Sequence, residues 1–89
     1  MKEKTDFKEE NIIENNEVRF LVLHNDDIHT FDYVIDTLID ICNHNTQQAE
    51  QCTMLVHFKG KCAVKEGSFD TLKPIREKLV QKELNATID

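Results

Sequence analysis

Residues 18–34 read VRFLVLHNDDIHTFDYV, and this stretch decides the fold of the first half of the chain. Residues 18–24 (VRFLVLH) are β-branched, aromatic and leucine-rich, which is typical of a short strand, and the polar triplet Asn25-Asp26-Asp27 stops it. Thr30 then has the side chain and the position of a helix N-cap. Apolar residues follow it at helical spacing and predict one buried helix face: Phe31, Val34, Ile35, Leu38, Ile41 and Cys42.

Capping residues predict a second helix directly after the first. The stretch Asn43-His44-Asn45 ends the first helix, and Asn45 or Thr46 caps the next one. Gly60 supplies the C-terminal stop of this second helix.

The last third of the chain is expected to hold a strand, a helix and a strand. Residues 61–65 (KCAVK) form the first of these strands, and 85–88 (NATI) the second. Ser68 caps the helix between them, but Pro74 disfavours a regular first turn, so we expect this helix to begin near Asp70 or Thr71. The order β-α-α-β-α-β predicts an α+β domain, a small three-stranded antiparallel sheet packed with three helices.

The composition indicates one small acidic domain. A net charge of −6 over 89 residues leaves no basic stripe for the phosphates of nucleic acid or for an anionic membrane surface. No apolar run reaches membrane-spanning length and no signal peptide is evident, so we expect a cytoplasmic protein. The odd cysteine count agrees, because Cys42, Cys52 and Cys62 suit small buried side chains in a reducing compartment better than zinc ligands.

Residues 1–17 are expected to form a flexible N-terminal arm, with the folded core spanning 18–89. The arm is dominated by charged residues, and its few apolar members cannot bury enough surface to order it. It is either a solvated leader or a segment presented to a partner, and the residues themselves leave both interpretations open.

Two segments together suggest a binding site. The turn Asn25-Asp26-Asp27 offers acceptors, and residues 55–60 (LVHFKG) place His57 at the end of an apolar helix face. Acceptors beside apolar faces suit an ammonium group attached to an apolar side chain. Each segment alone has a plainer explanation, because Asx residues bond their own backbone in turns and histidines contact the last carbonyls of helices.

Nothing in the sequence favours an enzyme. No nucleophile–base pair is evident, and two glycines are too few for a phosphate-binding loop. The histidines at 24, 29, 44 and 57 lack metal-ligand spacing, so we expect neither a metal site nor a cofactor. The chain is better interpreted as a binding module.

The two segments resemble the ClpS family, the adaptors that deliver N-degron substrates to Clp ATPase–protease machines. The similarity covers nearly all of 18–89: the strand and its Asn-Asp-Asp turn, the helix start 31–38 (FDYVIDTL), the helix from Ala49 to Gly60 with its Val-His-Phe-Lys-Gly-Lys ending, and the closing strand. The family also has an N-terminal arm that enters the ATPase, which the resemblance implies for residues 1–17.

The resemblance implies a mechanism. The free amino terminus of a substrate would be held by Asn25, Asp26 and His57. Its first side chain, Phe, Tyr, Trp or Leu, would enter an apolar pocket formed by Phe31, Val34, Thr53, Val56 and Leu84. The implied partner is a ClpA-like or ClpC-like AAA+ ATPase, with the adaptor a monomer when free. The alternative is a ClpS-like regulator that binds the ATPase without recognising N-degrons.

The chain differs from the family pattern at three places. His29-Thr30-Phe31 stands where the family usually has Thr-Pro-Met, and Thr53 stands where it has a second methionine. Lys73-Pro74-Ile75 replaces charged and polar residues of the third helix, which touches the ATPase in the family. Because a phenyl ring adapts less than methionine, we expect Phe31 to favour aromatic guests and to exclude β-branched ones.

Overall fold

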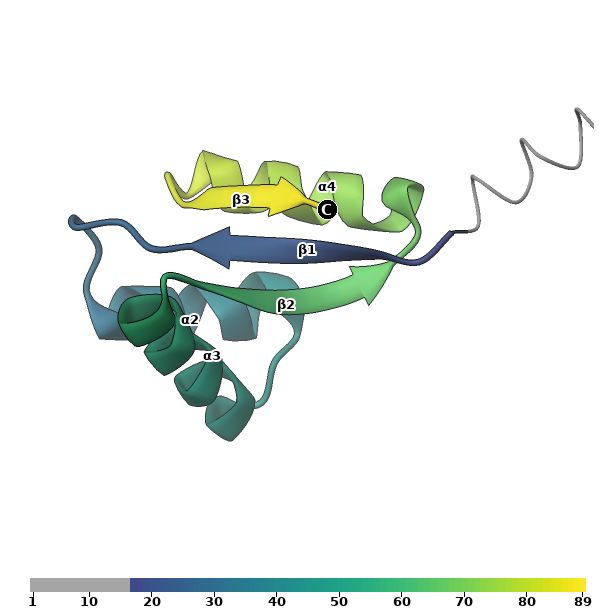
Figure 1. The fold of residues 1–89 in the computed structure, drawn as a ribbon. Helices are drawn as coiled ribbons and strands as arrows, with labels where there is room; N and C mark the ends of the chain where they lie inside the picture. The colour runs from purple at the N-terminus through teal and green to yellow at the C-terminus, as the bar shows by residue number, and fades with distance from the viewer. Residues whose placement is uncertain (1–16) are drawn as a thin grey trace, which may run out of the picture.

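A computed structural model describes residues 17–89 of the chain, so the predicted arm lies outside the described residues except for Glu17. Six elements follow one another in the predicted order (Figure 1). They are β1 (Arg19–His24), α2 (Phe31–Cys42), α3 (Thr46–Lys59), β2 (Lys61–Gly67), α4 (Phe69–Gln81) and β3 (Asn85–Ile88). The predicted α+β class and its element order are confirmed.

The sheet has β1 in its centre, between β2 and β3, and both neighbours run antiparallel to it (Figure 1). Leu23 pairs with Cys62 on one side and with Ala86 on the other. The pairing with β2 shifts between Leu21 and Val22, so that β2 carries one extra residue there. The central strand is therefore fixed on both edges.

One buried cluster joins the sheet to all three helices. Leu21 and Leu23 of β1 are 0% and 1% exposed. Side chains from every other element complete the cluster: Val34, Leu38, Cys42, Ala49, Val56, Val64, Leu72, Leu79, Leu84 and Ala86. Because a domain of this length has little core to spare, each helix contributes its apolar face to the same cluster.

The predicted helix caps are confirmed. Thr30, Asn45 and Ser68 each accept a hydrogen bond from the backbone N–H three residues further on, at 2.7–3.2 Å. Asn43 ends α2 in the left-handed region, with φ 62°. Such caps satisfy backbone groups that a helix end leaves without partners.

Two predicted boundaries were wrong. Helix α4 begins at Phe69, not near Asp70 or Thr71, because the Ser68 cap secures its first turn and Pro74 removes a single backbone donor. Strand β2 continues to Gly67 instead of ending at Lys65, since Arg19 and Phe20 of β1 still pair with it there. In the described part of the chain, no helix is long and apolar enough to cross a membrane.

Candidate functional site

A cavity of about 290 Å³ lies where the turn after β1, the start of α2 and the end of α3 meet. All eight residues predicted for the site line it: Asn25, Asp26, Phe31, Val34, Thr53, Val56, His57 and Leu84. Five further residues complete its lining: Leu23, His24, Asp27, His29 and Thr30. We call this space the main cavity.

A backbone hydrogen bond brings the two halves of the site together. The N–H of Asn25 donates to the carbonyl oxygen of Gly60 at 2.9 Å. Gly60 is the residue that stops α3, in the left-handed region with φ 95°, and His57 lies one turn before it. The acceptor turn and the histidine, far apart in the sequence, are thereby held at the same edge of the fold.

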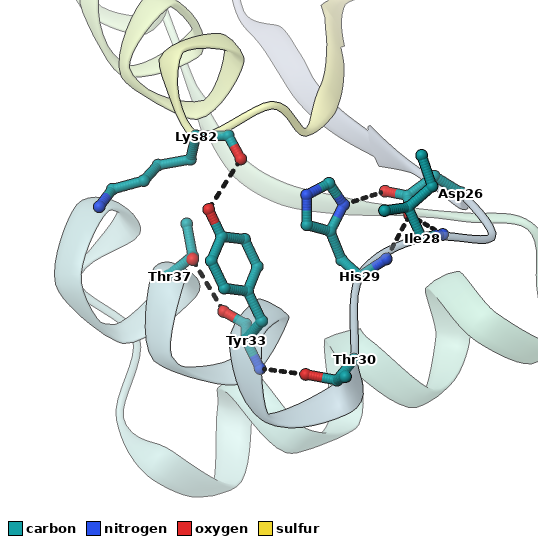
Figure 2. Close-up of polar contacts among 7 residues, drawn as sticks. All are labelled: Asp26, Ile28, His29, Thr30, Tyr33, Thr37 and Lys82. Carbon is teal, nitrogen blue, oxygen red and sulfur yellow. Dashed lines mark hydrogen bonds and ion pairs between the residues drawn. The ribbon is translucent and has the colours of Figure 1, made fainter.

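Asp26 organises the turn. Its Oδ1 accepts from the backbone N–H groups of Ile28 at 2.8 Å and His29 at 2.9 Å, and its Oδ2 lies 2.9 Å from His29 Nδ1 (Figure 2). Burial alone would raise the pKa of the Asp26 carboxyl, but these hydrogen bonds and the nearby His29 ring together lower it. Asp26 is therefore held as an ionised carboxylate, and it shapes the turn as Asx residues commonly do.

His29 was not predicted as a site residue, yet it lines the main cavity. The ring stacks on Tyr33 with the centroids 4.8 Å apart and the planes 18° from parallel. The Tyr33 hydroxyl in turn donates to the carbonyl oxygen of Lys82 at 2.9 Å (Figure 2). This contact ties α2 to the segment that carries Leu84.

His57 is exposed and lines the main cavity. Phe31 meets it edge-on at a centroid distance of 5.1 Å, and Phe58 meets it at 4.8 Å. Both contacts are close to perpendicular, the geometry that aromatic pairs favour. The ring is thus oriented by its aromatic neighbours.

The remaining wall of the cavity is mostly apolar. Val34, Val56 and Leu84 are buried, whereas Phe31 is 39% exposed and stands at the rim. Thr53 is 2% exposed, and its hydroxyl donates to the carbonyl oxygen of Ala49 at 2.7 Å. Its proton is therefore engaged within α3.

The lining of the cavity thus combines hydrogen-bond acceptors with apolar side chains. Such an arrangement suits a ligand with a cationic head and one apolar group. Within residues 17–89, no cluster of three histidine, cysteine or acidic side chains is placed to hold a metal ion.

The fold and this two-part cavity define a small binding domain, and the sequence places it in a family. Residues 15–87 match the family described as ATP-dependent Clp protease adaptor protein ClpS. The chain belongs to the ClpS family and is therefore an adaptor of the Clp protease, not an enzyme. No curated protein sequence matches the chain significantly.

A solved structure supports the fold. The chain is similar to Agrobacterium tumefaciens ClpS2 bound to L-phenylalaninamide, with 19% sequence identity and a TM-score of 0.78. The match covers 83% of this chain and 96% of the Agrobacterium chain. The order of strands and helices predicted from the sequence is thereby confirmed.

Proposed function

We propose that this adaptor binds proteins whose first residue is Phe, Tyr, Trp or Leu and delivers them to a Clp-type AAA+ ATPase for degradation. The observation that carries this proposal is that all eight predicted site residues line one cavity, which brings hydrogen-bond acceptors and apolar side chains together. The ligand named for the Agrobacterium protein, L-phenylalaninamide, has both a free amino group and a phenyl side chain.

The amino group of the substrate would be held by three side chains. A cation that leaves water needs acceptors to replace its hydration, and hydrogen bonds to charged groups are the strongest available. Asn25 offers an amide oxygen, Asp26 a carboxylate and His57 a ring nitrogen. Asp26 already accepts bonds from its own turn, but a carboxylate has about four lone-pair sites, so it can accept from the ammonium directly or through water.

The first side chain of the substrate would fill the apolar part of the main cavity, against Phe31, Val34, Thr53, Val56 and Leu84. Burying a large apolar side chain contributes roughly 1.5–3 kcal/mol. The ammonium fixes the direction of entry and contributes to affinity, and the buried side chain adds to that affinity. An internal residue, which has no free amino group, would lack the first of these interactions.

The delivery step rests on the family. The partner would be a ClpA-like or ClpC-like ATPase, bound by a cytoplasmic adaptor that is a monomer when free, and residues 1–17 would act as the arm that engages it. Deleting residues 1–15 removes nothing from the buried cluster, so peptide affinity and thermal stability should stay unchanged. Degradation of a substrate with N-terminal Phe by the cognate protease should collapse, and unimpaired degradation would contradict the role of the arm.

The competing function is regulation of the ATPase without N-degron recognition. The two are separated by fluorescence anisotropy with one labelled peptide that begins with Phe, in free and acetylated form. Acetylation removes the charge and leaves the side chain intact. We expect the free peptide to bind at least tenfold more tightly, whereas equal affinity, or no binding of either peptide, would favour the regulator.

A further inference from the structure

His29 is the residue of the cavity wall that the family resemblance does not explain. It stands where the family usually has threonine, and its side chain is 12% exposed in a position that lines the main cavity. An imidazole ring differs from a threonine in size and in offering a nitrogen acceptor on a rigid plane. The question is which of its two ring nitrogens is available to a ligand.

The contact with Asp26 fixes the tautomer of His29. An ionised carboxylate only accepts hydrogen bonds, so Nδ1, 2.9 Å from Asp26 Oδ2, must carry the proton of a neutral ring. Nε2 then holds a free lone pair. The chain thus makes this nitrogen an acceptor.

The Nε2 atom is also accessible. Within residues 17–89, the buried side-chain nitrogens that lack a partner are His44 Nδ1 and Arg76 Nε, and Nε2 of His29 is not among them. His29 is one of the residues that line the main cavity, so a group that enters the cavity comes against this residue.

The ring is held in place before any ligand arrives. Asp26 bonds one of its edges, and Tyr33 stacks on one of its faces and is itself bonded to the Lys82 carbonyl (Figure 2). A fixed acceptor gains more from a hydrogen bond than a mobile one, because less side-chain freedom is lost on binding. Thr53, another polar residue of the lining, is 2% exposed, and its hydroxyl already donates a hydrogen bond to the Ala49 carbonyl.

We propose that Nε2 of His29 accepts a hydrogen bond from the phenol of an N-terminal tyrosine, so that the cavity discriminates tyrosine from phenylalanine. This proposal rests on the proposed N-degron function and names a side chain that sets its specificity. A hydrogen-bond acceptor within an apolar wall favours the guest that carries a matching donor, since the guest without one leaves the acceptor unpaired.

The test measures the dissociation constants of two peptides that differ only in an N-terminal Phe or Tyr. The wild-type protein is compared with His29→Phe, which keeps a flat ring and removes both nitrogens. Any damage to the turn weakens both peptides alike, so the ratio of the Phe to the Tyr constant is the informative quantity. We expect this ratio to fall about three- to tenfold in the variant, the range of one neutral hydrogen bond.

Two controls make the outcome decisive. Tyr33→Phe removes the bond to Lys82 but not the acceptor, so it should change the ratio less than His29→Phe does. A peptide that begins with 4-fluorophenylalanine, tested on the wild-type protein, matches tyrosine in shape and lacks the donor, and it should bind about three- to tenfold more weakly than tyrosine.

The outcomes separate the two proposals. Binding of both peptides with the same ratio in wild type and His29→Phe, or equal affinity for tyrosine and 4-fluorophenylalanine, would overturn the role of His29 alone. Failure of the wild-type protein to bind any of these peptides would overturn the N-degron function itself.

Discussion

The backbone N–H of Asn25 and the carbonyl oxygen of Gly60 are 2.9 Å apart, and this bond joins the end of β1 to the end of α3. Gly60 also donates its own N–H to the Val56 carbonyl at 3.0 Å. One residue therefore stops a helix and anchors the turn that supplies the acceptors of the site. The backbone conformation of Gly60 therefore fixes the position of this turn relative to the end of α3.

Gly60→Ala should destabilise the fold by about 1 kcal/mol, because φ of 95° is unfavourable for a residue with a Cβ. The added Cβ would meet no atom within 4 Å, so backbone strain accounts for the whole loss of stability. Gly67→Ala is the matched control, since its Cβ would make ordinary contacts from 3.6 Å outward. Urea unfolding of both variants measures the difference, and equal destabilisation would contradict the explanation.

Asp26→Ala should weaken a peptide with N-terminal Phe by more than tenfold, about 1.4 kcal/mol. The variant loses the carboxylate for the ammonium and the bonds that shape the turn. Asp36→Ala removes the same charge from α2 outside the main cavity, so it should bind as the wild type does. An equal loss in both variants would show that overall charge, not Asp26, governs affinity.

The lowered pKa of Asp26 predicts how stability depends on pH. A carboxyl group whose pKa is lower in the folded protein stabilises it above the unfolded value, here 3.8, and this contribution disappears as pH falls through the folded value. Asp26→Asn keeps the Oδ1 acceptor and removes the charge. Its free energy of unfolding should lie below that of the wild type at pH 7, by less than about 1 kcal/mol for a partly exposed pair, and the melting temperatures of the two proteins should converge below pH 3.8. A gap that persists in acid would contradict this assignment.

Peptide binding should weaken in acid because of His57. A protonated ring cannot accept from an ammonium group and also repels it. Affinities measured from about pH 8 to 5.5 span the range in which histidine side chains change charge. His57→Ala should bind more weakly at pH 8 and show a smaller decline. A decline of the same size in both proteins would point to His29 or His24, which also line the cavity.

The guest preference should follow from Phe31. This ring stands at the rim, packed edge-on against His57, and a phenyl ring cannot bend as methionine does. Peptides that begin with Phe or Tyr should bind at least as well as Leu, and those with Ile or Val poorly, because their branched Cβ meets Phe31. Phe31→Met should narrow that difference. Anisotropy across the five peptides decides, and tight binding of Ile or Val would refute the steric role.

The elements of the fold were predictable because their signals are local. The side chains of Thr30, Asn45 and Ser68 are of the types that cap helix N-termini, so they indicate where helices begin. Apolar spacing identifies the buried helix faces. The start of α4 was not predictable, since it depends on whether the Ser68 cap outweighs the missing donor of Pro74. The extension of β2 depends on its pairing with Arg19 and Phe20, a contact between distant segments.

Some residues of the site were predicted from the sequence and others were not. Family resemblance supplied the eight residues that surround the cavity, and spacing alone would have left Asn25 and His57 as separate weak signals. His29 was missed because its importance depends on a stack with Tyr33 and a bond to Asp26. The triplet pattern did suggest an Asx turn, and Asp26 does form one.

The position of Leu84 has a consequence for how the cavity is closed. Every other residue of the main cavity lies between positions 23 and 57, but Leu84 comes from the segment between α4 and β3, next to the C-terminus. The wall of the cavity is therefore complete only when α4 and β3 are packed against the rest of the fold. Local unfolding of these two elements would open the main cavity while its other lining residues stay in place.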